Sequence, residues 1–444
     1  MNWLNKHFEL DARGTTVGTE FRGAVATFLT MAYILAANPA ILSAAGVPFD
    51  SAVACTALAA GICTLLMGFV ANFPLALASG MGLNALIAFT AAAATGSWQT
   101  AMGIVVVEGL VILVLVALGL REAMLDAIPV DLRRGMAAGI GLFIALIGCV
   151  NSGLVTGNEI PPLKPGSFTE PPVLITLSGI AIIGALLSRK VPGAILIGIV
   201  LCALASHGWN QFAPQVTEAS AETTSPVEEH ATSLLPSFEI IGQADVMGAL
   251  SWKFLPLIIT LLMVDFFDTL GTVTALGDQT GLKDAEARVP GLRRILFVDS
   301  ISAAIGGWFG VSSVTSYIES AAGISEGART GLHSVFVGLF FLACVFASPL
   351  VALIPPEATA PALIVVGCLM ASSITRIDFN KAATAVPAFV TLLLIPASYS
   401  ISHGIGYGVM TFVAIHLLTG RWRDVHPLLY GTVVVFGVAF SLSL

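Results

Sequence analysis

Long apolar segments, separated by shorter polar stretches, follow one another along almost the whole chain. Each is close to the length of about 20 residues that an α-helix needs to cross the hydrocarbon core of a bilayer. The pattern predicts an all-α polytopic membrane protein with fourteen transmembrane segments. A further apolar stretch, 428–443, is either a fifteenth span or a helix at the membrane interface. The expected spans are 22–43, 50–72, 78–94, 98–118, 133–150, 172–187, 191–208, 253–277, 293–309, 310–328, 332–352, 359–373, 383–399 and 403–419.

The composition agrees with this class of protein. Only 10% of the 444 residues are charged and 56% are hydrophobic, whereas about 25% of residues are charged in soluble domains. The six cysteines and seven histidines lack the spacing of a metal site, so we expect no metal and no cofactor. Nothing in the composition points to a nucleic-acid partner. The polar N-terminus lacks the apolar region of a cleavable signal.

The positions of Lys and Arg test the order of the spans, because cytoplasmic loops carry an excess of these residues. With the N-terminus in the cytoplasm, seventeen of the nineteen fall on the inner side, and only Lys164 and Lys253 fall outside. We therefore expect a multi-pass protein with a cytoplasmic N-terminus. The longest outer loop, 209–252, is acidic and rich in Ser and Thr, and it is expected to be an irregular connector.

Seven spans precede this outer loop and seven follow it. An odd number per half inserts the two halves in opposite orientations, which is the condition for an inverted repeat. The chain then divides into a first repeat at 1–208, the outer loop at 209–252, a second repeat at 253–419 and an apolar C-terminal segment at 420–444.

The third span of each repeat is interrupted in the same way. NFPLALASGMG precedes the short helical pattern LNALIAFTAAAA, and GGWFGVSSVTS precedes YIESAAGISEGA. Each helix covers roughly 18 Å of a core about 30 Å thick, so the preceding stretch must be extended. Extended backbone at that depth is tolerated only inside protein or beside a water-filled cavity. Paired interrupted spans at matching positions indicate the binding site of a transporter.

Three acids lie inside apolar spans, where a carboxylate at the bilayer centre costs roughly 2.5–3.5 kcal/mol. Asp265 and Asp268 share one face of the eighth span, and Glu319 lies in the tenth. Such residues are candidates for a functional site by default. Each could instead be structural, and Asp265 could serve only to orient Asp268.

Further polar residues fall at the ends of the two short helices. Asn84 lies near the start of the first, and Tyr317 and Ser320 lie with Glu319 near the start of the second. Helix N-termini present unpaired N–H groups and the positive end of the helix dipole. Two such ends meeting near the middle of the membrane would form a polar pocket. Satisfying broken backbone is the alternative role for Asn84, and ordinary packing is the alternative for Tyr317.

At these residues the sequence resembles the nucleobase–cation symporters, and within them the AzgA-like branch of hypoxanthine, guanine and adenine permeases. The resemblance covers the chain up to about residue 430. Its motifs are TFLTMAYILAANPAIL in the first span, ASGMGLNA in the third, VDFFDTLGT in the eighth and SSVTSYIESAAGISEGARTGL at the tenth.

The resemblance implies two inverted seven-span repeats in which the third and tenth spans are part strand and part short helix. Spans 1–4 and 8–11 would form a core domain, and spans 5–7 and 12–14 a gate domain through which a homodimer forms. The protein would lie in the bacterial inner membrane. In the related uracil and xanthine branch, glutamates in the eighth and tenth spans contact the base. The glycine at Gly271 aligns Asp268, rather than Asp265, with the first of these.

The tenth-span pattern of that branch is Tyr-x-Glu-Asn, matched here by Tyr317, Ile318, Glu319 and Ser320. Carboxylates of Glu319 and Asp268 suit the ring N–H groups of a purine, and the amide of Asn84 suits a mixed edge. Tyr317 could pack on the ring face. An acid removed from water can take up a proton and release it when the cavity opens, so proton symport would need only Asp268, Glu319 and Asp265.

The sequence thus predicts a secondary active transporter, not an enzyme, that imports purine nucleobases by alternating access. It leaves open which purine is preferred and whether the coupling ion is a proton or sodium. An anion carrier on the same architecture is disfavoured by the acids. An intramembrane aspartyl protease would need a Gly-x-Gly-Asp motif, and the nearest string, at 275–278, lacks the first glycine. A channel is a further alternative.

Overall fold

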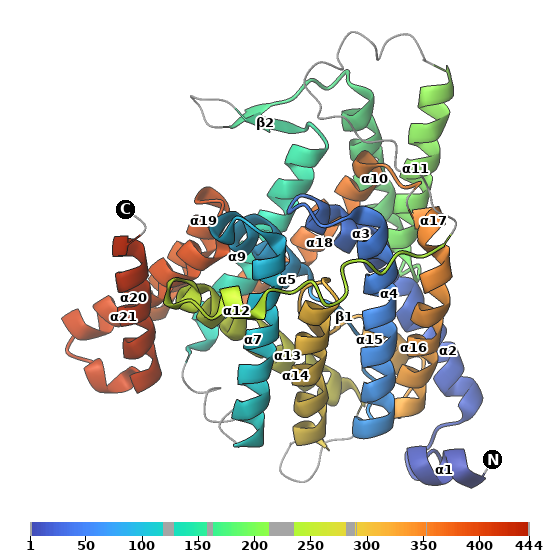
Figure 1. The fold of residues 1–444 in the computed structure, drawn as a ribbon, viewed down its shortest axis with the longest axis horizontal. Coiled ribbons are helices and arrows are strands. Elements are labelled where there is room, and N and C mark those ends of the chain that lie inside the picture. Colours follow the sequence, from blue (N-terminus) through green and yellow to red (C-terminus); the bar gives the residue numbers. More distant parts are fainter. Residues whose placement is uncertain are drawn as a thin grey trace.

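The computed structural model describes residues 2–118, 128–157, 163–212, 235–280, 289, 291–351 and 353–442, and nearly all of them are helical (Figure 1). The first half contains α1 (Asn2–Phe8), α2 (Val17–Met31), α3 (Ile34–Ser43), α4 (Phe49–Leu66), the π-helix η1 (Met67–Ala71), β1 (Leu77–Ser79), α5 (Met81–Ala85), the π-helix η2 (Leu86–Ala91), α6 (Ala92–Thr95), α7 (Trp98–Ala117), α9 (Val130–Asn151), β2 (Val155–Gly157), β3 (Leu163–Pro165), α10 (Pro171–Ser188) and α11 (Ala194–Phe212).

The second half contains α12 (Val246–Ala249), η3 (Trp252–Phe254), α13 (Leu255–Thr280), α14 (Leu292–Trp308), β4 (Val314–Ser316), α15 (Ser320–Ser325), α16 (Gly331–Cys344), η4 (Val345–Ala347), α17 (Ser348–Val351), α18 (Pro356–Ala371), η5 (Ser372–Arg376), α19 (Ala382–Ala397), α20 (Ile401–Leu418), η6 (Trp422–Asp424) and α21 (Pro427–Leu442). These elements coincide with the predicted spans to within a few residues at most ends.

Apolar helices of membrane-spanning length make up much of this list. Within the described residues, seven helices are long and apolar enough to cross a bilayer, and shorter apolar helices accompany them, among them Met81–Thr95. The stretch expected at 428–443 is the helix α21, which packs against α20 and α13. It reaches α20 where a glycine leaves room, because a Cβ on Gly406 would lie 2.8 Å from Phe436 and 2.6 Å from Phe440.

The packing of the two halves follows the same pattern when the halves are exchanged. Helix α4 packs against α16 as α7 packs against α14, and α10 packs against α11 as α19 packs against α20. Two pairs become themselves when the halves are exchanged, because each joins an element to its own counterpart. These are α9 with α18 and β1 with β4. This correspondence agrees with the inverted repeat that the span count predicts.

Glycines allow the closest of these helix contacts. A Cβ on Gly61 of α4 would lie 3.1 Å from the Gly338 carbonyl oxygen of α16, and one on Gly338 would lie 2.9 Å from that of Gly61. The contact between α9 and α18 is tighter still, since a Cβ on Gly141 would lie 2.6 Å from the Gly367 oxygen. These pairs hold their helices at a separation that larger side chains would not permit.

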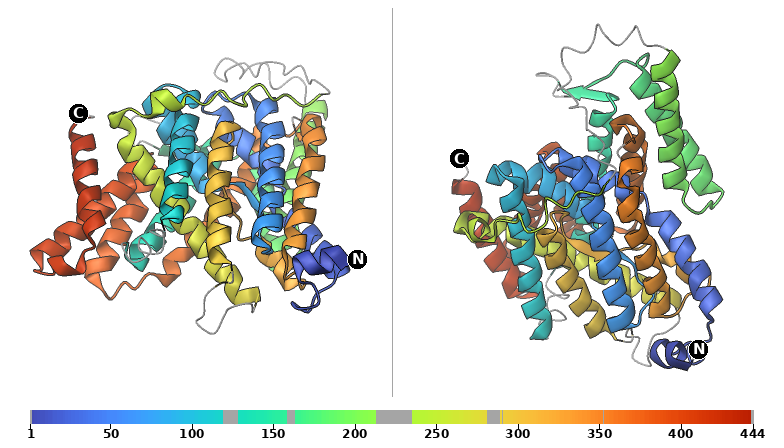
Figure 2. Two further views of the ribbon diagram at one scale, coloured as in Figure 1. Left: turned by 60° about the horizontal axis from the view of Figure 1, so that its bottom comes forward. Right: turned by 45° about the vertical axis from the view of Figure 1, so that its right-hand side comes forward.

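The helices gather into two groups. One group surrounds the strands β1 and β4 near the middle of the molecule and contains α2–α7 and α13–α16 (Figure 1). The other contains α9, α10, α11, α18, α19 and α20, which pack mainly against one another. In the right-hand view of Figure 2, the green helices α10 and α11 stand at the edge of the molecule.

The two ends of the molecule are distinguished by peptide segments that close over them. At one end, the N-terminal segment packs Phe8 and Leu10 against Leu332 of α16, and Arg13 donates to the Arg329 carbonyl at 3.2 Å. We call this the α1 end. The polar N-terminal segment is therefore folded against the helices.

At the opposite end, residues 235–251 of the long loop form a strap across helix ends. The Gly242 amide donates to the Trp308 carbonyl of α14 at 2.8 Å, and the Asp245 amide donates to the Gln99 carbonyl of α7 at 2.9 Å. The sequence predicts an irregular connector here, and the described part is irregular apart from the short helix α12 and is also fixed to the helices. Residues 213–234 of the same loop lie outside the described residues.

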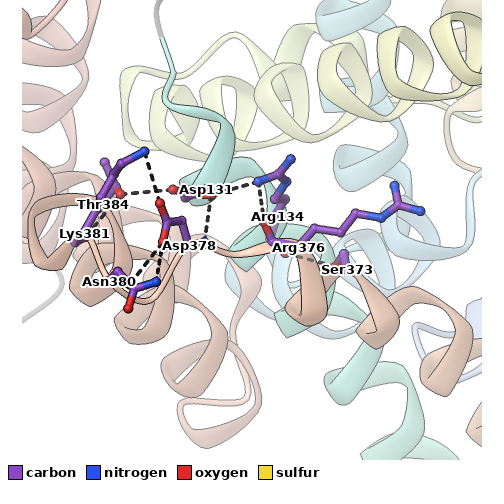
Figure 3. A network of polar contacts seen from close by, with 8 residues as sticks. All are labelled: Asp131, Arg134, Ser373, Arg376, Asp378, Asn380, Lys381 and Thr384. Atoms are coloured by element: carbon purple, nitrogen blue, oxygen red, sulfur yellow. Dashed lines mark hydrogen bonds and ion pairs between the residues drawn. The ribbon is translucent and has the colours of Figure 1, made fainter.

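A polar network joins the ends of α9, η5 and α19 within the second helix group (Figure 3). The Asp131 carboxylate accepts hydrogen bonds from Arg134 at 3.0 Å, from the Thr384 hydroxyl at 3.0 Å and from the Asp378 amide at 3.4 Å. The Lys381 ammonium, 3.1 Å from Asp378, lowers the pKa of that carboxyl below its usual value. The network ties three chain segments together outside the apolar part of the fold.

Candidate functional site

Two short strands form the centre of the first helix group. β1 and β4 pair antiparallel, with Leu77 opposite Ser316 and Ser79 opposite Val314, and both strands are buried. Each strand leads directly into a short helix, α5 after β1 and α15 after β4. The predicted strand-and-helix form of the third and tenth spans is thus confirmed, and the extended backbone finds its partners across the repeat.

Backbone contacts extend this pairing beyond the strands. The Gly80 amide donates to the Ser313 carbonyl, and the Tyr317 amide donates to the Ala76 carbonyl, both at 3.0 Å. Ser320, at the start of α15, is fully buried, and its hydroxyl oxygen accepts the Ala76 amide at 2.9 Å. Ser320 therefore holds the beginning of β1 against α15.

The two acids of α13 have different surroundings although they lie one helical turn apart. Asp265 is 1% exposed, and its Oδ2 accepts a hydrogen bond from the Ser313 hydroxyl at 2.6 Å. Asp268 is exposed, in the middle of a 26-residue helix. Asp265 thus fixes α13 to the segment before β4, whereas Asp268 faces an accessible space.

Glu319 also has accessible surface, and it lies at the start of α15, which packs against α13. It is partly exposed, and the neighbouring Ile318 is 47% exposed. Its Oε1 accepts a hydrogen bond from the Tyr33 hydroxyl at 3.0 Å. Asp268 lies within electrostatic reach of Glu319. Tyr317 is buried, and its hydroxyl donates to the Ser79 carbonyl.

Asn84 lies in α5, on the first-repeat side of the strand pair, and has no exposed surface. Its Oδ1 accepts a hydrogen bond from the Ser79 hydroxyl at 2.8 Å. Its Nδ2 has no hydrogen-bond partner among the described residues. A buried donor without a partner costs about 1–3 kcal/mol, so this amide is suited to binding an acceptor brought by a ligand.

Two residues at the site were not predicted from the sequence. Tyr33 lies where the first span breaks between α2 and α3, and only the fold brings it to Glu319. Asp299 is an acid within an apolar span, the signal that singled out the other three. It is 1% exposed and accepts hydrogen bonds from the Thr269 hydroxyl at 2.8 Å and the Ser316 hydroxyl at 2.9 Å.

The site as a whole contains acceptors on one side and an unpaired donor on the other. Asp268 and Glu319 offer carboxylate oxygens to the accessible space, and Asn84 offers an amide N–H behind it. Asp265 accepts a hydrogen bond from Ser313, just before β4, and Asp299 accepts one from Ser316, in β4. Within the described residues, no group of three or more His, Cys, Asp or Glu side chains is arranged to hold a metal ion.

Comparison with known proteins gives full-length matches. Residues 18–406 match the Xan_ur_permease model, described as the Permease family. Adenine permease AdeQ of Escherichia coli strain K12 is 39% identical over 445 residues, which cover 99% of this chain and 96% of the relative. Guanine/hypoxanthine permease PbuG of Bacillus subtilis strain 168 is 38% identical, and the match covers 98% of this chain and 99% of that protein.

A solved structure shares the fold. The transmembrane domain of the cyanobacterial bicarbonate transporter BicA superimposes with a TM-score of 0.60 at 18% sequence identity, over 88% of this chain and 97% of that domain. The likeness extends to the architecture alone. It establishes an all-helical polytopic membrane fold, in agreement with the class that the sequence predicts.

The carboxylate of Asp299 is expected to hold β4 in place. In Asp299→Ala, the Ser316 hydroxyl loses its acceptor, whereas Thr269 keeps its contact with the Thr315 hydroxyl at 2.9 Å, and the protein should be destabilised by about 1–3 kcal/mol for the group left unpaired. The control is Asp424→Ala, which removes an exposed ion pair with Arg421 and should cost less than about 1 kcal/mol. Thermal unfolding of the purified protein in detergent measures both. Equal unfolding temperatures for the two variants would contradict the role of Asp299.

Proposed function

We propose that this chain, which belongs to the Permease family, imports purine nucleobases by secondary active transport. Family membership makes the chain a multi-pass membrane permease rather than an enzyme. The observation that carries the proposal is the pair Asp268 and Glu319, two intramembrane acids that both have accessible surface and lie within electrostatic reach of each other. Full-length relatives named as adenine and as guanine/hypoxanthine permeases support a purine as the occupant.

The chemistry of the site suits a purine edge. Ionised carboxylates only accept hydrogen bonds, so Glu319 and Asp268 would bind ring or exocyclic N–H groups. The Nδ2 of Asn84 would donate to a ring nitrogen or a carbonyl oxygen. Tyr317 and Ser320 are both buried and bonded to β1, so we assign them the task of shaping the site rather than that of direct contact.

We propose the proton as the coupling ion. A carboxyl group can hold a proton while the site is closed and release it to water when the site opens. Asp268 and Glu319 are the acids placed to do so, because both have accessible surface. Asp265 is bonded to Ser313 and has almost no exposed surface, so its part is support for Asp268. Sodium is the alternative coupling ion.

The contacts of α5 favour alternating access. On this side of the site, a Cβ on Gly82 would lie 2.9 Å from Ile140 of α9. Further along, the Phe89 ring lies 6.0 Å from that of Phe143 in α9 and 6.1 Å from that of Tyr399, which precedes α20. These contacts close α5 and η2 against the second helix group, and Asn84 is buried behind them.

The α15 side of the site differs, since Ile318, Asp268 and Glu319 all have accessible surface there. The loop after α15 reaches the α1 end, where Arg13 bonds to Arg329. We therefore assign the structure to a state that is open toward the α1 end and closed toward the strap. With the cytoplasmic N-terminus that the Lys and Arg positions favour, this is the inward-open state.

The two helix groups correspond to the core and gate domains that the sequence resemblance implies. Transport would then move the group around β1 and β4 against the group of α9 and α18, with the purine carried between them. A homodimer through the second group, in a bacterial inner membrane, completes the proposal.

Removal of the carboxylate of either Asp268 or Glu319 should slow purine uptake strongly. Cells lacking their own permeases and expressing Asp268→Asn or Glu319→Gln should accumulate labelled hypoxanthine, guanine or adenine at least about tenfold more slowly than wild type, since each change removes an acceptor for a substrate N–H. Glu326→Gln, at an exposed acid at the other end of α15, is the matched control and should transport normally. Unchanged uptake by both site variants would refute the assignment.

The same assay tests the coupling ion. Collapsing the proton gradient should abolish concentrative uptake by the wild type and leave equilibration unaffected. Concentrative uptake that survives this treatment and stops when sodium is removed would replace the proton with sodium.

Accessibility of the site from the two faces should be unequal. In Ile318→Cys, a membrane-impermeant thiol reagent should label the new cysteine in inside-out vesicles and not in whole cells, because the contact of Phe89 with Phe143 and Tyr399 closes the other side. Adding Phe143→Ala should allow labelling from both faces. Wild-type protein measures the background of the six native cysteines. Equal labelling of the single variant from both faces would contradict the assigned state.

A further inference from the structure

We propose that Asn38 and Ser79 are positioning residues that hold the Asn84 amide with its N–H₂ group toward the site, so that Asn84 recognises a hydrogen-bond acceptor atom of the purine. The inference rests on the proposed function and deepens it. Neither residue touches the accessible space, since Asn38 has no exposed surface and Ser79 is 1% exposed. They act through a chain of hydrogen bonds that crosses four separate segments of the protein.

The chain begins in α4. The Thr56 hydroxyl donates to the Ala52 carbonyl at 2.6 Å, so its oxygen is left to accept the Asn38 Nδ2 at 2.8 Å. This contact determines which end of the Asn38 amide is the donor. The same Nδ2 approaches the Val311 carbonyl oxygen at 3.4 Å. Asn38 therefore supplies an N–H to a carbonyl in the segment before β4.

The Val311 carbonyl is also in contact with the Ser79 hydroxyl at the end of β1. A serine hydroxyl has one proton to donate. Two acceptors lie within its reach, the Val311 oxygen and the Asn84 Oδ1 at 2.8 Å. Asn38 donates to one of the two lone pairs of the Val311 oxygen, which weakens that oxygen as a competitor for the Ser79 proton, and we assign the proton to Asn84.

This choice sets the chemical character of Asn84. With Oδ1 held by Ser79, the amide nitrogen points away and has no partner among the described residues. If the amide were reversed, its nitrogen would donate to Ser79 and its oxygen would be presented instead. The first orientation binds an acceptor of the ligand and the second binds a donor.

The arrangement supplies what the two acids lack. Asp268 and Glu319 bind N–H groups of a purine, but a purine also has ring nitrogens and, in the 6-oxo forms, a carbonyl oxygen. Asn84 would bind one of these acceptors when the α5 side opens, because in the present state it is closed behind Gly82 and Ile140. Uptake from the strap end therefore measures its contribution.

The test uses analogues of the transported purine that each lack one acceptor, with CH in place of N1, N3 or N7, or H in place of a 6-oxygen. Their inhibition of labelled purine uptake gives relative affinities. For wild type, one analogue should bind about tenfold more weakly than the parent, because the missing acceptor atom leaves the buried Asn84 donor unpaired. If no single acceptor matters, the proposal is wrong even though purine transport stands.

The positioning role is tested by variants. In Asn84→Ala the penalty for the sensitive analogue should vanish. Asn38→Leu, which keeps the side-chain size, and Ser79→Ala should each reduce that penalty to less than about threefold while the parent purine is still transported. Thr90→Val removes a buried hydroxyl from the same span without touching the chain, and it should keep the wild-type penalty.

The outcomes separate the two levels of inference. Absence of purine uptake by wild type would refute the proposed function itself. A full penalty retained in both Asn38→Leu and Ser79→Ala would overturn the positioning role alone. If one of these variants is lost from the membrane, the other decides the question, because each breaks the chain at a different bond. If both are lost, Asn84→Ala compared with wild type still decides whether Asn84 presents a donor, and a penalty that persists in Asn84→Ala overturns the proposal.

Discussion

Extended backbone in the interior of a bilayer must find its hydrogen-bond partners within the protein, because lipid offers none. Here β1 supplies partners to β4 and β4 to β1, and the Thr64 hydroxyl of α4 adds contacts to the amide and carbonyl of Leu77. The positions of the candidate residues in the third and tenth spans follow from this pairing. Glu319 and Asn84 lie directly beyond the two strands, and Asp265 and Asp299 hold the segment around β4 through Ser313 and Ser316.

The intramembrane acids divide into two kinds by their exposure to solvent. Asp265 and Asp299 accept hydrogen bonds from hydroxyl groups and have almost no exposed surface. Asp268 and Glu319 keep carboxylate surface open to the accessible space. The first pair fixes the site and the second is available to a ligand and a proton. Intramembrane acids in one protein therefore need not share a function.

The sequence was sufficient for the architecture because its signals are local. Three signals predicted elements that the fold contains. These are the length of the spans, the concentration of Lys and Arg in alternate loops, and the short helical patterns near Asn84 and Tyr317. The sequence did not predict which side chains contact one another. The three-residue spacing of Asp265 and Asp268 could not reveal that one bonds to Ser313 while the other faces open space. Tyr33 reaches Glu319 from almost three hundred residues away, a contact that no local pattern encodes.

The pairing of β1 with β4 also bears on how the protein is made. Residues 77–79 leave the ribosome and enter the membrane long before residues 314–316 are synthesised. Until then the strand of the first repeat has no partner strand. Contacts so distant in sequence form late in folding, after the local helices. The binding site is thus completed only when the second half has been inserted, and a chain interrupted during synthesis would contain half a membrane protein without a pathway through it.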